Sequence, residues 1–158
     1  MKILLTFVLF LTVTFAKDYA YFLPEDSAKL QAHLEKLILE SQSSIDIAMY
    51  NFDSKKLAKF LKKAHENGTI VSVVFDKSKV EKEKKIKYEY LKEKGINTYV
   101  ADKKMHLKMA LFDNKTVMLG SLNWTKASFE DNYEIVYITD SKKAVKKSKK
   151  IFKELKEK

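Results

Sequence analysis

His106 and Lys108 stand two residues apart in an alternating segment, and their types suit phosphoryl chemistry better than any other pair in the chain. Side chains of an extended segment repeat every two residues, so a strand over residues 105–112 would place the imidazole and the ammonium group on one face. The opposite face is predicted to be core and carries Leu107, Met109 and Leu111. A nucleophile and a phosphate-binding cation would then lie together.

A single histidine supplies only half of what this chemistry needs. Covalent cleavage of a phosphodiester requires a neutral nucleophile and, on the far side of the phosphorus, an acid that protonates the leaving oxygen. Imidazole can fill either role, because its ordinary pKa of about 6.5 allows both forms near neutrality. One ring cannot stand on both sides, and a two-fold dimer would place its copy opposite. We therefore expect a homodimer.

Further polar residues follow the strand at fixed offsets. They are Asp113, then Gly120-Ser121-Leu122-Asn123, then Asn132-Tyr133-Glu134. Together with His106 and Lys108, this pattern resembles the phospholipase D superfamily, most closely its small, single-motif bacterial endonucleases, over about residues 21–150. The resemblance implies a phospholipase D-like fold and hydrolysis of phosphodiester bonds without a metal ion or other cofactor.

The resemblance also implies a role for each catalytic candidate. His106 would form a phosphohistidine, while His106 of the partner subunit would act first as general acid and then as base for water. Lys108 and Asn123 would hold the non-bridging oxygens, and Ser121 would be another oxygen-contacting or hydrogen-bonding residue. Glu134 would accept a hydrogen bond from the other ring nitrogen of a histidine and fix its orientation.

Three residues of the pattern are expected to support the site. Asp113 has an odd offset from Lys108, so in a regular strand its side chain points away from the face that carries His106 and Lys108. We therefore assign it a structural role, as a turn-starting or ion-paired carboxylate. Gly120 is expected to permit a close backbone approach at a strand end. Asn132 is expected to brace the site.

Three aromatic residues are candidates for substrate contact. Tyr50 and Phe52 follow a buried strand, at the edge where α/β folds commonly bind ligands, although packing explains them equally well. Trp124, beside Asn123, could stack on a base or fill the dimer interface, and we favour packing. His33 and His65 lie on predicted helices without partners, and we interpret both as ordinary surface or boundary residues.

Strands alternate with helices along the chain, which predicts an α/β fold with a mixed β-sheet sandwiched between helices in one domain, residues 17–158. Gly68 and Gly95 are predicted to end two of the helices. Strands are expected at residues 19–23, 44–50, 69–75, 96–100, 105–112, 116–119 and 133–139, and helices from about 24, at 54–67, at 77–94 and from 141.

The first residues have the pattern of a secretory leader, with a lysine, an apolar run over residues 3–15 and a small residue at Ala16. We expect residues 1–16 to be a signal peptide and the protein to be exported to the periplasm or the cell surface. An uncleaved N-terminal membrane anchor is the alternative. The chain has no cysteine, which excludes disulfides, thiolate metal sites and cysteine nucleophiles.

The formal charge is +10 at pH 7, and it is carried by lysine without any arginine. This favours polyanionic partners, either nucleic acid or acidic lipid headgroups. Arginine is the usual bidentate reader of guanine, so we expect sequence-independent binding of DNA or RNA, guided by lysines in residues 77–94 and 142–158. The alternatives are phospholipid hydrolysis or phosphatidyl transfer, and a non-catalytic module that binds nucleic acid or anionic membrane.

Overall fold

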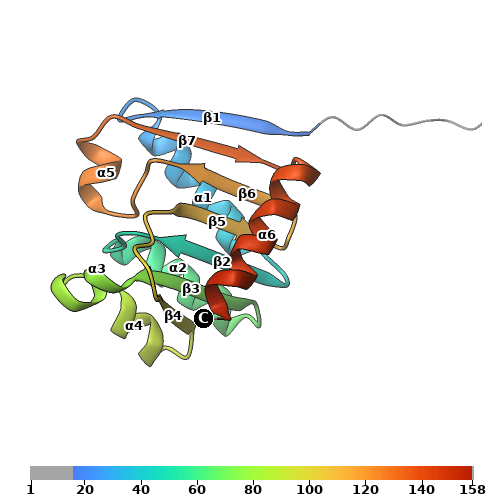
Figure 1. Ribbon diagram of the computed structural model, residues 1–158. Helices are drawn as coiled ribbons and strands as arrows, with labels where there is room; N and C mark the ends of the chain where they lie inside the picture. Colours follow the sequence, from blue (N-terminus) through green and yellow to red (C-terminus); the bar gives the residue numbers. More distant parts are fainter. Residues whose placement is uncertain (1–15, 158) are drawn as a thin grey trace, which may run out of the picture.

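The computed structural model describes residues 16–157, so the predicted leader lies, apart from Ala16, outside the described residues. Seven strands form one mixed sheet in the order β1-β7-β6-β5-β2-β3-β4 (Figure 1). The strands β2, β3 and β4 are parallel, and each of the other neighbouring pairs is antiparallel. Their bounds are β1 (Asp18–Leu23), β2 (Ser44–Met49), β3 (Ile70–Asp76), β4 (Asn97–Ala101), β5 (Lys108–Phe112), β6 (Thr116–Gly120) and β7 (Glu134–Thr139).

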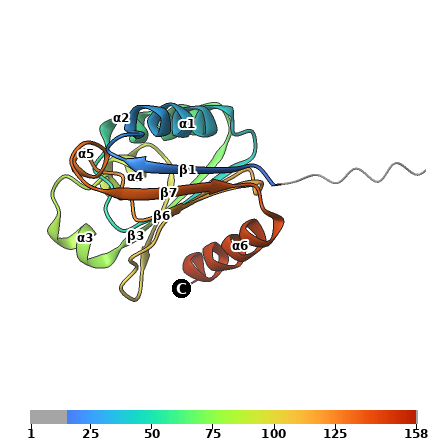
Figure 2. The same ribbon diagram turned by 90° about the horizontal axis from the view of Figure 1, so that it is seen from above.

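Helices cover both faces of the sheet, which confirms the predicted α/β sandwich (Figure 2). The helices α1 and α2 pack on one face, and α6 packs on the other. The shorter helices α3 and α4 flank the β3–β4 side, and α5 precedes β7 (Figure 1). Their bounds are α1 (Ser27–Glu40), α2 (Lys55–Glu66), α3 (Lys77–Lys82), α4 (Tyr88–Glu93), α5 (Lys126–Glu130) and α6 (Lys142–Lys156).

Two hydrophobic clusters fill the spaces between these layers. The larger one joins α1 and α2 to the sheet through leucines at helical spacing, including Leu30, Leu34 and Leu61. The smaller one lies under α6 and includes Met109, Leu111 and Phe152. Consecutive residues of β5 therefore face opposite clusters, as the strand period requires, with both faces of this central strand buried.

Two predicted helical features differ from the structure. The single helix predicted over residues 77–94 is wrong, because α3 ends at Lys82 and α4 begins only at Tyr88. Between them, the backbone N–H of Lys87 donates to the carbonyl oxygen of Phe52 at 2.9 Å, a tertiary contact that local helical pattern does not reveal. The five-residue helix α5 was not predicted at all; Thr125 caps it by accepting a hydrogen bond from the N–H of Ser128.

Strand directions bring the polar motifs to one edge of the sheet. The carboxyl ends of β2, β3 and β6 meet the amino ends of β5 and β7 there, since Met49 pairs with Lys108 and Gly120 with Val136. We call this the β2/β5 edge. Within residues 16–157, no helix is long and apolar enough to cross a membrane.

Candidate active site at the β2/β5 edge

Tyr50 brings His106 and Lys108 together at the β2/β5 edge. The ring centroids of Tyr50 and His106 are 4.4 Å apart, in an edge-on arrangement. The ammonium nitrogen of Lys108 lies 4.8 Å from the centroid of the Tyr50 ring and donates a hydrogen bond of 3.0 Å to the carbonyl oxygen of His106. The two predicted residues therefore share one aromatic neighbour.

His106 precedes β5 rather than lying within it, so the strand predicted to begin at Met105 starts three residues later. The extended path still continues past the strand, because the N–H of Tyr50 donates to the carbonyl oxygen of Leu107 at 2.9 Å. Leu107 was predicted to be core, and this is wrong: it is 37% exposed, since the sheet ends there. The side chain of His106 is exposed, whereas that of Lys108 is buried.

The site favours a neutral imidazole. Burial and the neighbouring cations Lys108 and Lys104 lower the pKa of His106, and the more weakly acting carboxylate of Asp76 raises it. Burial also lowers the pKa of Lys108, while the negative charge of Glu134 opposes this change. At neutral pH, His106 therefore carries a lone pair that can attack an electrophile.

Asp76, which the sequence analysis did not single out, anchors the segment that carries His106. Its side chain is 1% exposed and accepts a 2.8 Å hydrogen bond from the backbone N–H of Met105 and another of 3.0 Å from the N–H of Ser78. Burial raises the pKa of Asp76, but hydrogen bonds from Ser78 and Met105 outweigh it and leave the pKa below its ordinary value. An ionised carboxylate thus fixes the residue next to the candidate nucleophile.

Asn123 lies at the same edge with its amide group oriented by the backbone. Its Oδ1 accepts a 3.2 Å hydrogen bond from the N–H of Asn51. This contact directs the acceptor oxygen into the protein and leaves the two N–H groups of the amide as potential donors. Such a group can contact a phosphate oxygen.

Ser121, Asn132 and Glu134 form a connected polar group beyond β6. The Ser121 hydroxyl donates to the Glu134 carboxylate and accepts a 3.1 Å hydrogen bond from the N–H of Ile135. The side-chain amide of Asn132 donates to the same carboxylate at 3.3 Å. Among the described residues, Glu134 forms hydrogen bonds with these two side chains and none with His106.

Gly120 and Asp113 occupy opposite ends of the β5–β6 hairpin. A Cβ atom on Gly120 would lie 2.2 Å from the carbonyl oxygen of Ile135, so this close approach of two strands requires glycine. Asp113 begins the hairpin turn at the far end of the sheet, where it accepts hydrogen bonds from the N–H groups of Ser43 and Ser44 at 2.8 and 3.1 Å. Asp113 therefore lies away from His106.

Two of the three aromatic candidates are packed inside the protein. Phe52 and Trp124 are each 0% exposed, and their rings meet edge-on with centroids 5.2 Å apart. The packing favoured for Trp124 is confirmed, and packing also holds for Phe52, for which substrate contact was the open alternative, because both rings belong to the core between the helices and the sheet. Tyr50 remains half-buried beside His106.

The other two histidines lie on α1 and α2. Nδ1 of His33 is hydrogen-bonded to the hydroxyl of Tyr21 at 2.8 Å, and His65 lies near the end of α2 against Gly95. Neither reaches the β2/β5 edge. Residues 16–157 contain no group of three or more histidine or acidic side chains that could hold a metal ion.

Comparisons with known families and proteins agree with this geometry. A family model described as "Cardiolipin synthase, PLD-like domain" matches residues 34–156. Mitochondrial cardiolipin hydrolase from Homo sapiens is 29% identical over 126 residues, which are 78% of this chain and 49% of that protein. The Xenopus laevis protein of the same name is 31% identical over 120 residues, 75% of this chain and 57% of that protein. The chain thus spans about half the length of these relatives.

Two solved structures resemble the whole domain. "NucT from Helicobacter pylori" matches with a TM-score of 0.83 and 28% identity, over 90% of this chain and 96% of that one. Nuc from Salmonella typhimurium, described as a phospholipase D family member, matches with a TM-score of 0.79 and 23% identity, over 89% of this chain and 93% of that one. The second likeness bears on the fold alone.

Proposed function

Because the chain belongs to the phospholipase D-like family, a family of phosphodiesterases, we propose that it hydrolyses phosphodiester bonds through a covalent intermediate on His106. The observation that carries this proposal is the contact of His106 and Lys108 with one tyrosine at an open edge of the sheet. A neutral imidazole and a cation lie there within reach of the same phosphate group.

The proposed reaction has two balanced steps. In the first, a ring nitrogen of His106 bonds to phosphorus, the bond to the leaving oxygen breaks, and that oxygen takes a proton from His106 of the partner subunit. In the second, the now neutral partner ring removes a proton from water, which attacks phosphorus and releases the phosphate monoester and free His106. Lys108 and the amide of Asn123 stabilise the charge on the non-bridging oxygens.

The need for a second subunit follows from the histidines available. The whole chain has three, and His33 and His65 lie on helices away from the site. A second histidine on the far side of the phosphorus must therefore come from another molecule, and a two-fold axis at the β2/β5 edge would supply it. In such a dimer, Glu134 is available to orient the partner's histidine, since it does not bond to His106 of its own chain.

An uncovered apolar strip is suited to this dimer contact. Phe22 of β1 pairs in register with Ile135 of β7, and the two side chains are 57% and 48% exposed. Both lie at the end of the sheet that carries the site, on strands with which α6 makes few contacts (Figure 2). Exposed apolar surface of this kind is typical of protein interfaces. We propose that a second copy of the chain covers it.

Nucleic acid is the substrate that we propose. The net charge of +10 favours a polyanion, and the similarity to NucT extends over nearly the full length of both chains. The second candidate is phospholipid hydrolysis, which the similarity to cardiolipin hydrolases favours. We further propose that the protein acts after export, in the periplasm or at the cell surface.

Purified protein assayed in chelator against plasmid, single-stranded DNA, RNA and vesicles of cardiolipin and phosphatidylcholine tests these proposals. We expect cleavage of nucleic acid, loss of essentially all turnover in His106→Ala, and full activity in the control His33→Gln. Hydrolysis of lipid alone would refute the nuclease. A His106→Ala variant that keeps its activity would refute the mechanism.

The dimer has its own test. Light scattering on the wild-type chain should give twice the monomer mass, and Ile135→Lys should give monomers that keep their circular dichroism spectrum but lose turnover. A fully active wild-type monomer would refute the half-site argument.

A further inference from the structure

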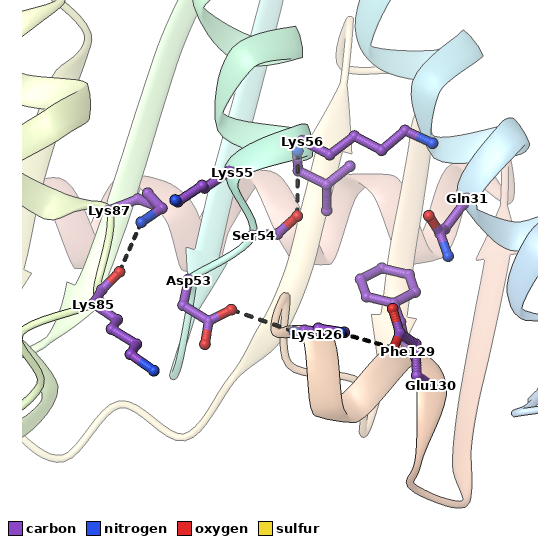
Figure 3. A pocket seen from close by; sticks show the side chains of 11 residues that line it. Gln31, Asp53, Ser54, Lys55, Lys56, Lys85, Lys87, Lys126, Phe129 and Glu130 are labelled. Atoms are coloured by element: carbon purple, nitrogen blue, oxygen red, sulfur yellow. Dashed lines mark hydrogen bonds and ion pairs between the residues drawn. The ribbon is translucent and has the colours of Figure 1, made fainter.

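A basic pocket lies between the loop that follows β2, the start of α2, and α5, on the face of the sheet covered by α1 and α2 (Figure 3). Its volume of about 550 Å³ is within the range of small-molecule sites. The buried side chains of Leu57 and Phe129 form an apolar floor. Its rim carries five lysines from three separate segments: Lys55, Lys56, Lys85, Lys87 and Lys126.

The positive charge of the rim is only partly neutralised. The ammonium nitrogen of Lys56 lies 3.8 Å from the carboxylate of Glu35, and that of Lys126 lies 3.6 Å from the carboxylate of Glu130. A third carboxylate, that of Asp53, lines the pocket and accepts a 3.3 Å hydrogen bond from the backbone N–H of Lys126. Among residues 16–157, no carboxylate lies within ion-pair distance of Lys55, Lys85 or Lys87. The ammonium group of Lys87 donates a 2.9 Å hydrogen bond to the carbonyl oxygen of Lys85, which leaves its positive charge in place (Figure 3). Three ammonium groups without a carboxylate partner repel each other, and an anion bound between them would relieve this repulsion.

The backbone joins this pocket to the catalytic residues over a short distance. The loop after β2 begins at Tyr50, which contacts His106, and reaches the pocket at Asp53 and Ser54. Four residues of extended chain span at most about 14 Å. Phosphates of one nucleic acid strand rise by about 3.4 Å per nucleotide along a duplex axis, so this stretch of the loop corresponds to about four nucleotides or fewer. The side chains at its two ends, Tyr50 beside His106 and Ser54 in the pocket, add to this span.

We infer that the pocket is a second phosphate subsite, which binds the backbone of the polynucleotide strand a few nucleotides from the bond that is cleaved. Lys55, Lys85 and Lys87 contact the phosphate, and the apolar floor accommodates part of the adjoining nucleotide. This inference deepens the proposed function and rests on it. It predicts that longer substrates bind better because they reach both sites.

The test compares two variants that each lose three lysine charges. The pocket variant is K55Q/K85Q/K87Q, and the control is K36Q/K63Q/K115Q, three exposed lysines outside the stretches 77–94 and 142–158. Binding to a fluorescent 20-nucleotide single strand is measured between 50 and 200 mM salt in the His106→Ala background, which prevents cleavage. Each lost phosphate contact should reduce the slope of log affinity against log salt concentration by about 0.7. If the variant and the parent bind equally at 1 M salt, this smaller slope lowers the affinity of the variant at 50 mM salt by about eightfold.

Hydrolysis separates the subsite from the catalytic proposal. With His106 intact, the pocket variant should cleave bis(p-nitrophenyl) phosphate, which is too small to reach the pocket, as fast as the wild type, while its KM for the 20-nucleotide strand rises about eightfold or more. Equal binding losses in the two variants would overturn the subsite, since only net charge would then matter. Lost binding to anionic vesicles with unchanged affinity for the oligonucleotide would also overturn it, in favour of a membrane contact. A wild type that cleaves neither substrate would instead contradict the proposed function.

Discussion

Asp76 links the stability of the fold to the position of His106, and Asp76→Asn tests this link. The carboxylate accepts hydrogen bonds from Met105 at 2.8 Å and Ser78 at 3.0 Å through different oxygens. An asparagine has only one acceptor oxygen, so one backbone N–H would face an amide N–H₂ group. Leaving a buried donor unsatisfied costs about 1–3 kcal/mol, which lowers the melting temperature by about 2–4 °C per kcal/mol in a domain of this size.

The effect on catalysis should be larger than the effect on stability. Met105 precedes His106 directly, and a displacement of about 1 Å at a reacting group costs about 100-fold in rate. We therefore expect Asp76→Asn to lower kcat for bis(p-nitrophenyl) phosphate by about 10- to 100-fold, measured well below the melting temperature of the variant. Urea denaturation gives the free energy of unfolding of the same samples.

Asp113→Ala is the matched control, because Ser43 and Ser44 donate to the same oxygen of Asp113, so an asparagine would keep both hydrogen bonds while alanine removes them. Asp113 also accepts backbone hydrogen bonds, from Ser43 and Ser44, but at the opposite end of the sheet. It should lose a similar free energy of unfolding, about 1–3 kcal/mol, with kcat nearly unchanged. If both variants lose kcat equally, destabilisation alone explains the result and the positioning role of Asp76 is refuted. Wild-type kcat in Asp76→Asn would refute it as well.

Two further predictions concern the protonation of His106 and the strand contact at Gly120. One His106 must be neutral and the partner's protonated, so kcat/KM should follow a bell-shaped pH profile. Since burial, Lys108 and Lys104 lower the pKa of His106, Lys104→Gln should move this profile to higher pH. A profile unaffected by Lys104→Gln would contradict this. Gly120→Ala should lower the free energy of unfolding by about 1–3 kcal/mol, as overpacking does, because its Cβ would lie 2.2 Å from the carbonyl oxygen of Ile135. An unchanged free energy of unfolding in urea denaturation would contradict this, since the two strands would then move apart at little energetic cost.

Local sequence patterns predicted the layers of the fold and the paired placement of His106 and Lys108. The period of two along residues 105–112 places both side chains beside Tyr50, although the strand itself begins only at Lys108. The same period wrongly assigned Leu107 to the core, because periodicity does not show where a strand extends beyond the part of the sheet that other elements cover. The turn at Asp113, by contrast, was found because it depends on local chain chemistry.

What the sequence did not reveal depends on contacts between distant segments. Asp76 alone is an ordinary residue after a strand, and its hydrogen bond to Met105 joins positions 29 residues apart. The burial of Phe52, which the sequence left open, likewise depends on Trp124, with which it forms an isolated bridge. The helix predicted over residues 77–94 is interrupted because Lys87 pairs with the backbone of Phe52. These partners become visible only when the chain is folded.

The burial of Lys108 leads to a last prediction, on ligand binding. Its ammonium group is held by a carbonyl oxygen and an aromatic ring, and burial lowers its pKa despite the charge of Glu134. A phosphate ion bound beside it would supply the missing countercharge, so binding should stabilise the protein and raise this pKa. At 100 times its Kd, a ligand adds about 2.7 kcal/mol to the free energy of unfolding.

Thermal melts in inorganic phosphate against chloride of equal ionic strength measure this effect. Phosphate should raise the melting temperature of the wild type by several degrees. Lys108→Met should lose this gain, because methionine keeps the volume of the side chain but carries no charge. Lys146→Met, on the exposed face of α6, should retain the gain. The basic pocket also attracts phosphate, so the melts are repeated with K55Q/K85Q/K87Q, in which the remaining gain should depend on Lys108 alone. If phosphate stabilises Lys108→Met in that background as much as it stabilises the parent, the ion does not bind at Lys108, and the assignment of this lysine as the phosphate-binding cation fails.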